Sequence, residues 1–274
     1  MNHQSHILTA CLMECTAPKP GNVSPIASFD DLTYRDFQRT APITAAGIAA
    51  ASRLGVGQSV LQTAQEISRQ VGRNTHLGIL LLLAPLVAAE TRQNLATTLD
   101  DLTVEDAKSV YEAIRIMEPG GIGEVESQDV QHEPTDTLLE CMRLAENHDT
   151  IARQYTNGFE DIFRFVDSLK PSAFQDDWKT HVIHLQLQMM SQIPDTLIAR
   201  KCGETIASEA TSRAQSVLNQ NQSEEALQDF DRWLRADGNR RNPGTTADMV
   251  AAILYIALRE NIIAAPHELT NSVD

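Results

Sequence analysis

Apolar residues recur at helical spacing along most of the chain. One stripe runs through the first 15 residues and another through 60–71, each with apolar side chains three or four positions apart. We find no series of alternating apolar and polar positions of the kind that half-buried strands show. The pattern predicts an all-α protein. Further helices are expected over 33–53, 75–90, 104–116, 135–148, 150–168, 177–192, 196–218, 223–236 and 246–260.

Two of these helices are apolar on every side. The segments 72–86 and 240–258 both run from a polar turn containing Arg and Asn into such a helix. A helix without a polar face must be buried. Each therefore directs its N-terminus, with free backbone N–H groups, at a polar place inside or beside the core.

The stretch 118–134 has the weakest pattern, with three glycines, two prolines and many acids, and it reads as a long loop. The helices on either side do not differ in composition. We therefore expect a single compact all-α domain over residues 1–274, with a functional or mobile loop at 118–134.

Composition limits the possible binding partners of the protein and its cellular compartment. The 274 residues carry 37 acidic and 22 basic side chains, a net charge of −15, which repels nucleic acid and anionic lipid. The N-terminus lacks the basic start of a signal peptide, and the most apolar run, 77–89, is too short to span a bilayer. The four cysteines show no disulfide framework. We expect a soluble cytoplasmic protein, and homo-oligomerisation stays open.

The two buried helix starts are candidate anion sites. Oriented N–H groups and the helix dipole favour a bound anion, and neighbouring Arg side chains add charge-assisted hydrogen bonds. Simple N-capping by Asn or Thr would explain part of this pattern, but not the arginines upstream. The candidate phosphate-binding residues here are Arg73, Asn74, Thr75, Gly78, Arg241, Asn242, Gly244, Thr245 and Thr246, with His76 as a candidate catalytic residue.

Asp248 follows the second turn closely and would repel a phosphate unless a cation lay between them. Mg²⁺ prefers one or two carboxylates plus phosphate oxygens, so a magnesium–polyphosphate site is one interpretation. Ordinary compensation of the helix dipole is the other.

The segment "TAPKPGNVSP" holds Lys19 between Pro18 and Pro20. The prolines restrict the backbone, and Gly21 allows close backbone approach, so Lys19 could present a fixed charge to a phosphate. A helix terminator with a solvated lysine is the alternative. Further along, Asp31 lies among three acids in seven residues, which suits a solvated helix start, a metal ligand or a general base.

Taken together, several stretches resemble the triphosphoribosyl-dephospho-CoA synthase family. They follow the family's order over most of the chain. The matching motifs are "PKPGNV" after Glu14, "FDDL", "NTHLG", "GEVE", "PDTLIARKCG" and "NPGTTADMVAA".

The resemblance implies an all-α fold that binds ATP and 3′-dephospho-CoA. The family joins the triphosphoribosyl part of ATP to a ribose 2′-hydroxyl and releases adenine. It implies functional positions at Glu14, Lys19, Gly21, Asp31, Asn74, Thr75, His76, Gly78, Glu124, Asp195, Gly244 and Asp248. We assign catalysis to Glu14, Asp31 and His76, and magnesium binding to Asp31, Asp195 and Asp248.

The chain departs from the family pattern at several positions. Phe29 stands where a His is usual, Leu77 where a Lys is usual, and Ile122 where an Arg is usual; Thr245 and Thr246 follow Gly244 in place of Gly-Ser. The chain looks like a divergent branch, similar to relatives associated with pterin-dependent one-carbon metabolism. The lost Lys and Arg suggest a less anionic acceptor.

The leading hypothesis is a Mg²⁺- and ATP-dependent transferase of this kind, acting on dephospho-CoA or a related acceptor. Two alternatives stay open: an ATP-dependent phospho- or nucleotidyl-transferase in cofactor biosynthesis, and a non-catalytic nucleotide-binding partner protein. The products distinguish them. Adenine indicates the first, ADP or pyrophosphate the second, and binding without turnover the third.

Overall fold

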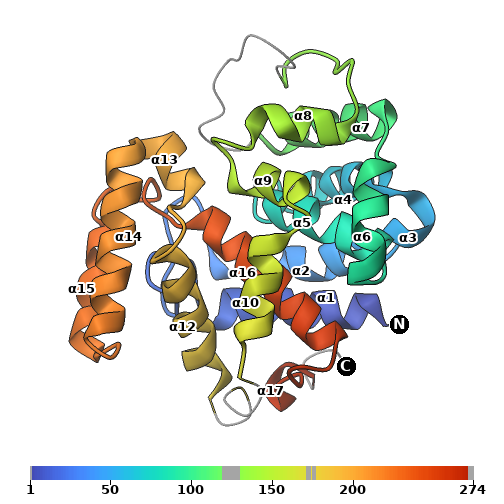
Figure 1. Ribbon diagram of the computed structural model, residues 1–274. Helices are drawn as coiled ribbons and strands as arrows, with labels where there is room; N and C mark the ends of the chain where they lie inside the picture. Colours follow the sequence, from blue (N-terminus) through green and yellow to red (C-terminus); the bar gives the residue numbers. More distant parts are fainter. Residues whose placement is uncertain (1, 119–129, 171–173, 175–176, 271–274) are drawn as a thin grey trace. The chain divides into compact units, whose positions relative to one another are not determined.

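The computed structural model describes residues 2–118, 130–170, 174 and 177–270. Within these ranges the regular structure is helical, and the only β-type pairing is an isolated bridge between Ser24 and Ala27. The prediction of an all-α protein is therefore confirmed (Figure 1). The expected loop at 118–134 lies mostly outside the described residues, as do Ile122 and Glu124.

The contacts divide the chain into two compact units. Unit 1 comprises Met1–Leu8 and Arg39–Phe163, and unit 2 comprises Thr9–Gln38 and Arg164–Asp274. The single-domain organisation expected from the sequence stays a prediction.

In unit 1, helices α4 and α7 pack along each other, and α4 also packs on the apolar helix α5 (Figure 1). Every residue of α5 from Leu77 to Val87 is buried, as its all-apolar sequence predicts. The helices that lie wholly in this unit are α3 (Ala51–Leu54), α4 (Val56–Gln70), α5 (Leu77–Ala88), α6 (Arg92–Asp100), α7 (Val104–Met117), α8 (Leu138–Ala145) and α9 (Thr150–Thr156).

In unit 2, the apolar helix α16 contacts α12 and α13, and α14 contacts α12, α13 and α15 (Figure 1). The helices of this unit are α12 (Trp178–Met190), α13 (Thr196–Cys202), α14 (Glu204–Asn219), α15 (Glu224–Arg235), α16 (Gly244–Arg259) and α17 (His267–Thr270). Three further helices, α1 (His3–Thr16), α2 (Tyr34–Ile48) and α10 (Glu160–Ser168), have residues in both units.

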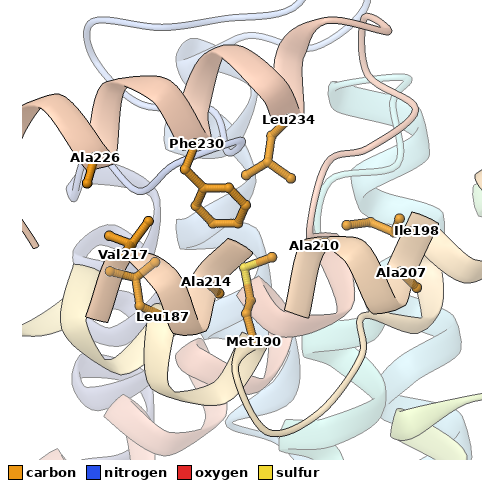
Figure 2. Packing of buried hydrophobic residues seen from close by; sticks show 10 residues of the cluster. All are labelled: Leu187, Met190, Ile198, Ala207, Ala210, Ala214, Val217, Ala226, Phe230 and Leu234. Atoms are coloured by element: carbon orange, nitrogen blue, oxygen red, sulfur yellow. The ribbon is translucent and has the colours of Figure 1, made fainter. Parts of the chain in front are cut away.

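A buried apolar cluster joins α12 to α15 in unit 2. Figure 2 shows Phe230 and Leu234 of α15 directed at Met190 of α12 and at the alanines of α14. Small side chains on α14, such as Ala210 and Ala214, let the neighbouring helices approach closely. This cluster supports the loop before α16, where several predicted site residues lie.

Three expected helices are each divided in two, and one of them, 33–53, becomes α2 and α3. The range 196–218 breaks at Gly203, whose φ of +91° a helix cannot accommodate, and 150–168 breaks between Thr156 and Glu160. No helix in the described part of the chain has both the length and the apolar character needed to cross a membrane.

Candidate functional site

Lys19 is buried and pairs with Glu14. Its ammonium Nζ lies 2.8 Å from Glu14 Oε1 and also donates to the Glu14 main-chain oxygen, and the two side chains are 0% and 4% exposed. The turn after α1 therefore folds the lysine back onto its own helix. The alternative of a solvated lysine is therefore wrong, because Lys19 is buried and its ammonium is paired inside unit 2. Phosphate binding by Lys19 stays a prediction.

Glu14 faces Lys19, and a carboxylate engaged in this way is poorly placed to take a proton from a substrate. Asp248, on α16, lies close enough to Cys11 of α1 for its charge to act on that thiol. Burial raises the pKa of the Cys11 thiol well above its usual value, and the charges of Cys15, Glu14 and Asp248 raise it further. The negative charges of Glu14 and Asp248 thus act on the same buried thiol of α1.

Gly21 is required by packing inside unit 2. Its φ is +75°, and a Cβ at this position would lie 2.6 Å from Leu234 Cδ1 and 2.9 Å from Pro243 Cδ. Its N–H donates to Asp231 Oδ1 over 2.8 Å. Close backbone approach was expected at Gly21, but the partners are α15 and Pro243, whereas the sequence suggested a phosphate.

A chain of amide side chains runs from the core of unit 2 to its surface. Gln186 Nε2 donates to Asn22 Oδ1 over 2.8 Å, and Asn22 Nδ2 donates to Asn242 Oδ1 over 2.8 Å. Asn242 Nδ2 donates to Asn239 Oδ1 over 2.9 Å, and Asn239 Nδ2 donates to Asp31 Oδ2 over 3.1 Å. Asp31 is exposed, so the network ends at a carboxylate that solutes can reach.

Asp195 caps two helices at once. Its Oδ1 accepts hydrogen bonds from the N–H groups of Leu197 and Ile198, which begin α13, and its Oδ2 accepts from Thr246 N at 2.7 Å and Thr246 Oγ1 at 2.8 Å. Burial raises the pKa of Asp195, and these hydrogen bonds oppose the shift. The first turn of α16 does hold an anion, but it is the protein's own carboxylate.

This arrangement bears on two predicted roles. A metal ion at Asp195 would have to replace some of four hydrogen bonds, and a phosphate at Thr246 would have to displace Asp195. Thr245 Oγ1 accepts a hydrogen bond from Thr196 Oγ1 at 3.3 Å, which ties the same two helix starts together again.

Gly244 has the same explanation as Gly21. A Cβ added there would lie 2.5 Å from Leu197 Cδ2, so the Leu197 side chain at the start of α13 would have to move. The close approach expected between Gly244 and a phosphate is, in the structure, an approach to Leu197.

Arg241 lies over the ring of Trp233, with its guanidinium carbon 4.7 Å from the ring centroid, and its Nη1 donates to the Trp233 main-chain oxygen over 3.2 Å. Arg213 covers the same ring at 4.6 Å. The Nε of Arg241 is buried and has no hydrogen-bond partner among the described residues. Arg241 is therefore held against α15, with one donor still available.

The start of α5 in unit 1 is held by one local hydrogen bond and by two hydrogen bonds to residues of α2. Asn74 Oδ1 accepts from Leu77 N at 3.3 Å, and Thr75 Oγ1 donates to Thr40 Oγ1 over 2.8 Å. His76 Nδ1 and Thr44 Oγ1 are hydrogen-bonded at 2.9 Å. Arg73 is exposed, and Gly78 is buried in the first turn of α5.

His76 is fully buried, and this burial lowers its pKa to about 3. The imidazole is therefore neutral near pH 7. A role for His76 in orienting a phosphate or in departure of a base would have to use a neutral ring.

The start of α5 belongs to unit 1 and the start of α16 to unit 2. Their convergence on one cleft, which the sequence suggested, stays a prediction. Within unit 2, the structure connects Asp31, Asn242 and the Gly21 turn through hydrogen bonds and contacts, and it connects Asp195, Gly244 and Thr246 in the same way.

The sequence did not point to Asp231 and Arg235, which connect α15 to the Gly21 turn in unit 2. Asp231 accepts from Gly21 N and is ion-paired with Arg235 at 2.9 Å, and Arg235 Nη2 donates to the Asn22 main-chain oxygen. Arg235 also lies over the Phe29 ring, 4.8 Å from its centroid. The only available signal was an i, i+4 Asp–Arg pair, which many exposed helices carry.

The donor chemistry limits how a metal could bind. In the described part of the chain, no group of three or more His, Cys, Asp or Glu side chains could hold a metal ion. A cation bound here would need oxygen atoms from a substrate in addition to one or two carboxylates, which is the usual manner of Mg²⁺.

The comparisons with known proteins place the chain among transferases. A family model described as ATP:dephospho-CoA triphosphoribosyl transferase matches residues 3–266, and the chain belongs to this family. A crystal structure of a candidate triphosphoribosyl-dephospho-CoA synthase from Archaeoglobus fulgidus is similar, with a TM-score of 0.66 and 25% identity. The similarity covers 81% of this chain and 98% of that one. No curated protein matches.

Proposed function

We propose that the protein transfers the triphosphoribosyl group of ATP to a hydroxyl group of 3′-dephospho-CoA or a related acceptor, with release of adenine. The observation that carries the proposal is the family match, which spans residues 3–266 and so includes both helix starts and the Lys19 turn. The crystal structure from Archaeoglobus fulgidus supports the same fold and class.

The reaction breaks an N-glycosidic bond and passes through an oxocarbenium-like state. A general base must take the proton of the attacking hydroxyl. Of the two carboxylates that we considered, Asp31 suits this role better, because it is exposed and oriented by Asn239, whereas Glu14 is buried against Lys19.

We propose that Mg²⁺ binds together with the triphosphate of ATP. Asp248 is the carboxylate near the start of α16 that we propose as its protein ligand, with Asp31 as a second candidate; Asp195 fits less well, because both of its oxygens accept hydrogen bonds. Bound Mg²⁺ would offset the negative charge of the triphosphate. Calorimetric titration with ATP tests the requirement, and an affinity unchanged by excess chelator would contradict it.

Two departures from the family pattern, Leu77 and Phe29, bear on the chemistry of the acceptor. Leu77 is buried, so a lysine at this position would have brought a charge into the first turn of α5. Phe29 contacts Arg235 in unit 2. These departures from the family pattern favour an acceptor with fewer negative charges than dephospho-CoA.

The decisive experiment incubates the protein with ATP, Mg²⁺ and dephospho-CoA and follows the products by mass spectrometry. Adenine together with a triphosphoribosylated acceptor is expected. ADP or pyrophosphate would instead favour a phospho- or nucleotidyl-transferase, and ATP binding without any product would favour a non-catalytic partner protein. An Asp31→Asn variant should lose most of the adenine release while keeping its fold, because Asp31 is exposed.

A further inference from the structure

Basic residues are scarce in this chain, with 22 against 37 acids, yet two adjacent pairs occur in short segments of unit 2. Arg200 and Lys201 end helix α13, and Arg240 and Arg241 lie in the loop before α16. Arg241 is held against Trp233. The other three basic side chains have no part in the site described so far.

Main-chain hydrogen bonds fasten the two segments together. Arg240 Nη2 donates to the Lys201 main-chain oxygen over 2.7 Å, and Lys201 Nζ donates to the Asn239 main-chain oxygen over 3.4 Å. Cys202 Sγ donates to the Arg240 main-chain oxygen over 3.5 Å. The end of α13 and the 239–240 turn are therefore in direct contact. The side chains of Arg200, Lys201 and Arg240 all begin in these two segments.

Arg240 and Lys201 each have a long polar contact within unit 2. Arg240 pairs with Asp237 at 3.4 Å, which is long for an exposed ion pair. The only hydrogen bond of the Lys201 ammonium within the described residues is the long one to Asn239. Burial lowers the pKa of Lys201, and the charge of Arg200 adds to this shift, whereas the charges of Asp31, Asp195 and Cys202 oppose it.

A partly buried ammonium group beside another cation is unfavourable in the free protein. A bound anion would reverse this, because its charge is attracted by both groups and its oxygens can accept several charge-assisted hydrogen bonds. Asp31 lies close enough to act on Lys201, so such an anion would bind next to the carboxylate that we propose as the base.

We propose that Arg200, Lys201 and Arg240 form a subsite for the phosphate groups of a substrate. The inference rests on the proposed function, in which both substrates carry phosphates: the triphosphate of ATP and the diphosphate diester of a dephospho-CoA-like acceptor. The shared ligand is a run of phosphoryl oxygens, bound beside Asp31.

Calorimetric titration of the full-length protein with two probes tests the subsite. Inorganic tripolyphosphate represents the donor, and ADP-ribose, a diphosphate diester, represents the acceptor. Lys201→Gln should raise the Kd of at least one probe by at least about tenfold, which is the effect of losing one charge-assisted hydrogen bond. Lys201→Arg should largely restore binding.

Arg232→Gln is the matched control. It removes one positive charge from an exposed side chain of α15 that is ion-paired with Asp229, so probe affinity should change less than about twofold. Circular dichroism of each variant shows whether the fold is kept. A Lys201→Gln variant that unfolds is replaced by Arg200→Gln, whose exposed side chain can be changed with less effect on packing.

The outcomes separate the sources of the phosphate. Weaker tripolyphosphate binding alone assigns the subsite to ATP, weaker ADP-ribose binding alone assigns it to the acceptor, and weaker binding of both supports a shared subsite. If the folded wild type binds neither probe, or a folded variant binds both as the wild type does, the inference is wrong. Adenine release is measured separately, so a failed subsite and a failed proposed function are distinguishable.

Discussion

Replacing Lys19 by Met should destabilise the protein strongly. The substitution keeps most of the side-chain volume but removes the ammonium group from a pair in which Glu14 is 4% exposed. The remaining carboxylate would be buried without a counter-ion, and its main-chain oxygen would lose a donor. Breaking a buried pair from one side costs about 3–5 kcal/mol.

The measurement is urea unfolding followed by circular dichroism and by tryptophan fluorescence. Both tryptophans, Trp178 and Trp233, lie in unit 2 with Lys19, so fluorescence reports on the unit that carries the change. Lys108→Met is the control. It breaks an exposed pair with Glu105 and should cost less than about 1 kcal/mol.

A second change tests the mechanism of destabilisation. Adding Glu14→Gln to Lys19→Met removes the uncompensated charge, so the double variant should be more stable than Lys19→Met alone by about 1–3 kcal/mol. A Lys19→Met variant as stable as the Lys108→Met control would refute the buried pair. So would a double variant no more stable than the single one.

The same variant separates the two roles considered for Lys19. If the lysine serves mainly the buried pair, the folded fraction of Lys19→Met should bind ATP with an affinity close to that of the wild type. If the lysine instead contacts phosphate, the Kd for ATP should rise at least about tenfold, as expected for a lost charge-assisted hydrogen bond.

Three further predictions concern neighbouring features. Gly21→Ala should lower the unfolding free energy by about 2–4 kcal/mol, because φ is positive there and the new Cβ would meet Leu234. Gly238 also has a positive φ but open space around it, so Gly238→Ala should lower the unfolding free energy by only about 1–2 kcal/mol. Urea unfolding midpoints compare the two variants. Because the pKa of His76 falls to about 3 on folding, unfolded chains bind the extra proton below about pH 6.5. His76 should therefore reduce stability by about 2 kcal/mol between pH 7 and pH 5, and His76→Gln should lack this part of the pH dependence. Asp195→Asn should cost about 1–3 kcal/mol, since an amide cannot accept all four hydrogen bonds; a melting temperature equal to that of the wild type would contradict the shared cap.

Much of the helical architecture could be predicted from apolar spacing. The run 77–89 became the buried helix α5, and the segment from Gly244 became the buried helix α16. Helix α6 was missed because its sequence is largely polar, although Thr91 caps it in an ordinary way. The break at Gly203 was missed because a glycine inside a helical pattern does not by itself reveal a positive φ.

The site was harder to predict because its partners are distant in sequence. Gly21 meets Asp231, which is 210 positions away, and Asn22 meets Asn242, which is 220 positions away. A lysine between two prolines is compatible with solvent, a ligand or a buried carboxylate, and local sequence does not distinguish them. Asp195 accepts hydrogen bonds from Thr246 at the start of α16, and only the tertiary structure brings these two residues together; phosphate binding at this helix start stays a prediction.

The discontinuity of unit 2 has a consequence for how the protein is made. The ribosome delivers 9–38 first, then the long stretch 39–163 of unit 1, and only afterwards the rest of unit 2. Asn22 must wait for Asn242, 220 positions later, which takes roughly 10–40 s at about 5–20 residues per second. During that interval the apolar side chains of α1 that belong to unit 2 lack the part of that unit that follows residue 163. We therefore expect the nascent chain to depend on chaperones at this stage, and a circular permutant that begins near residue 164 to depend on them less.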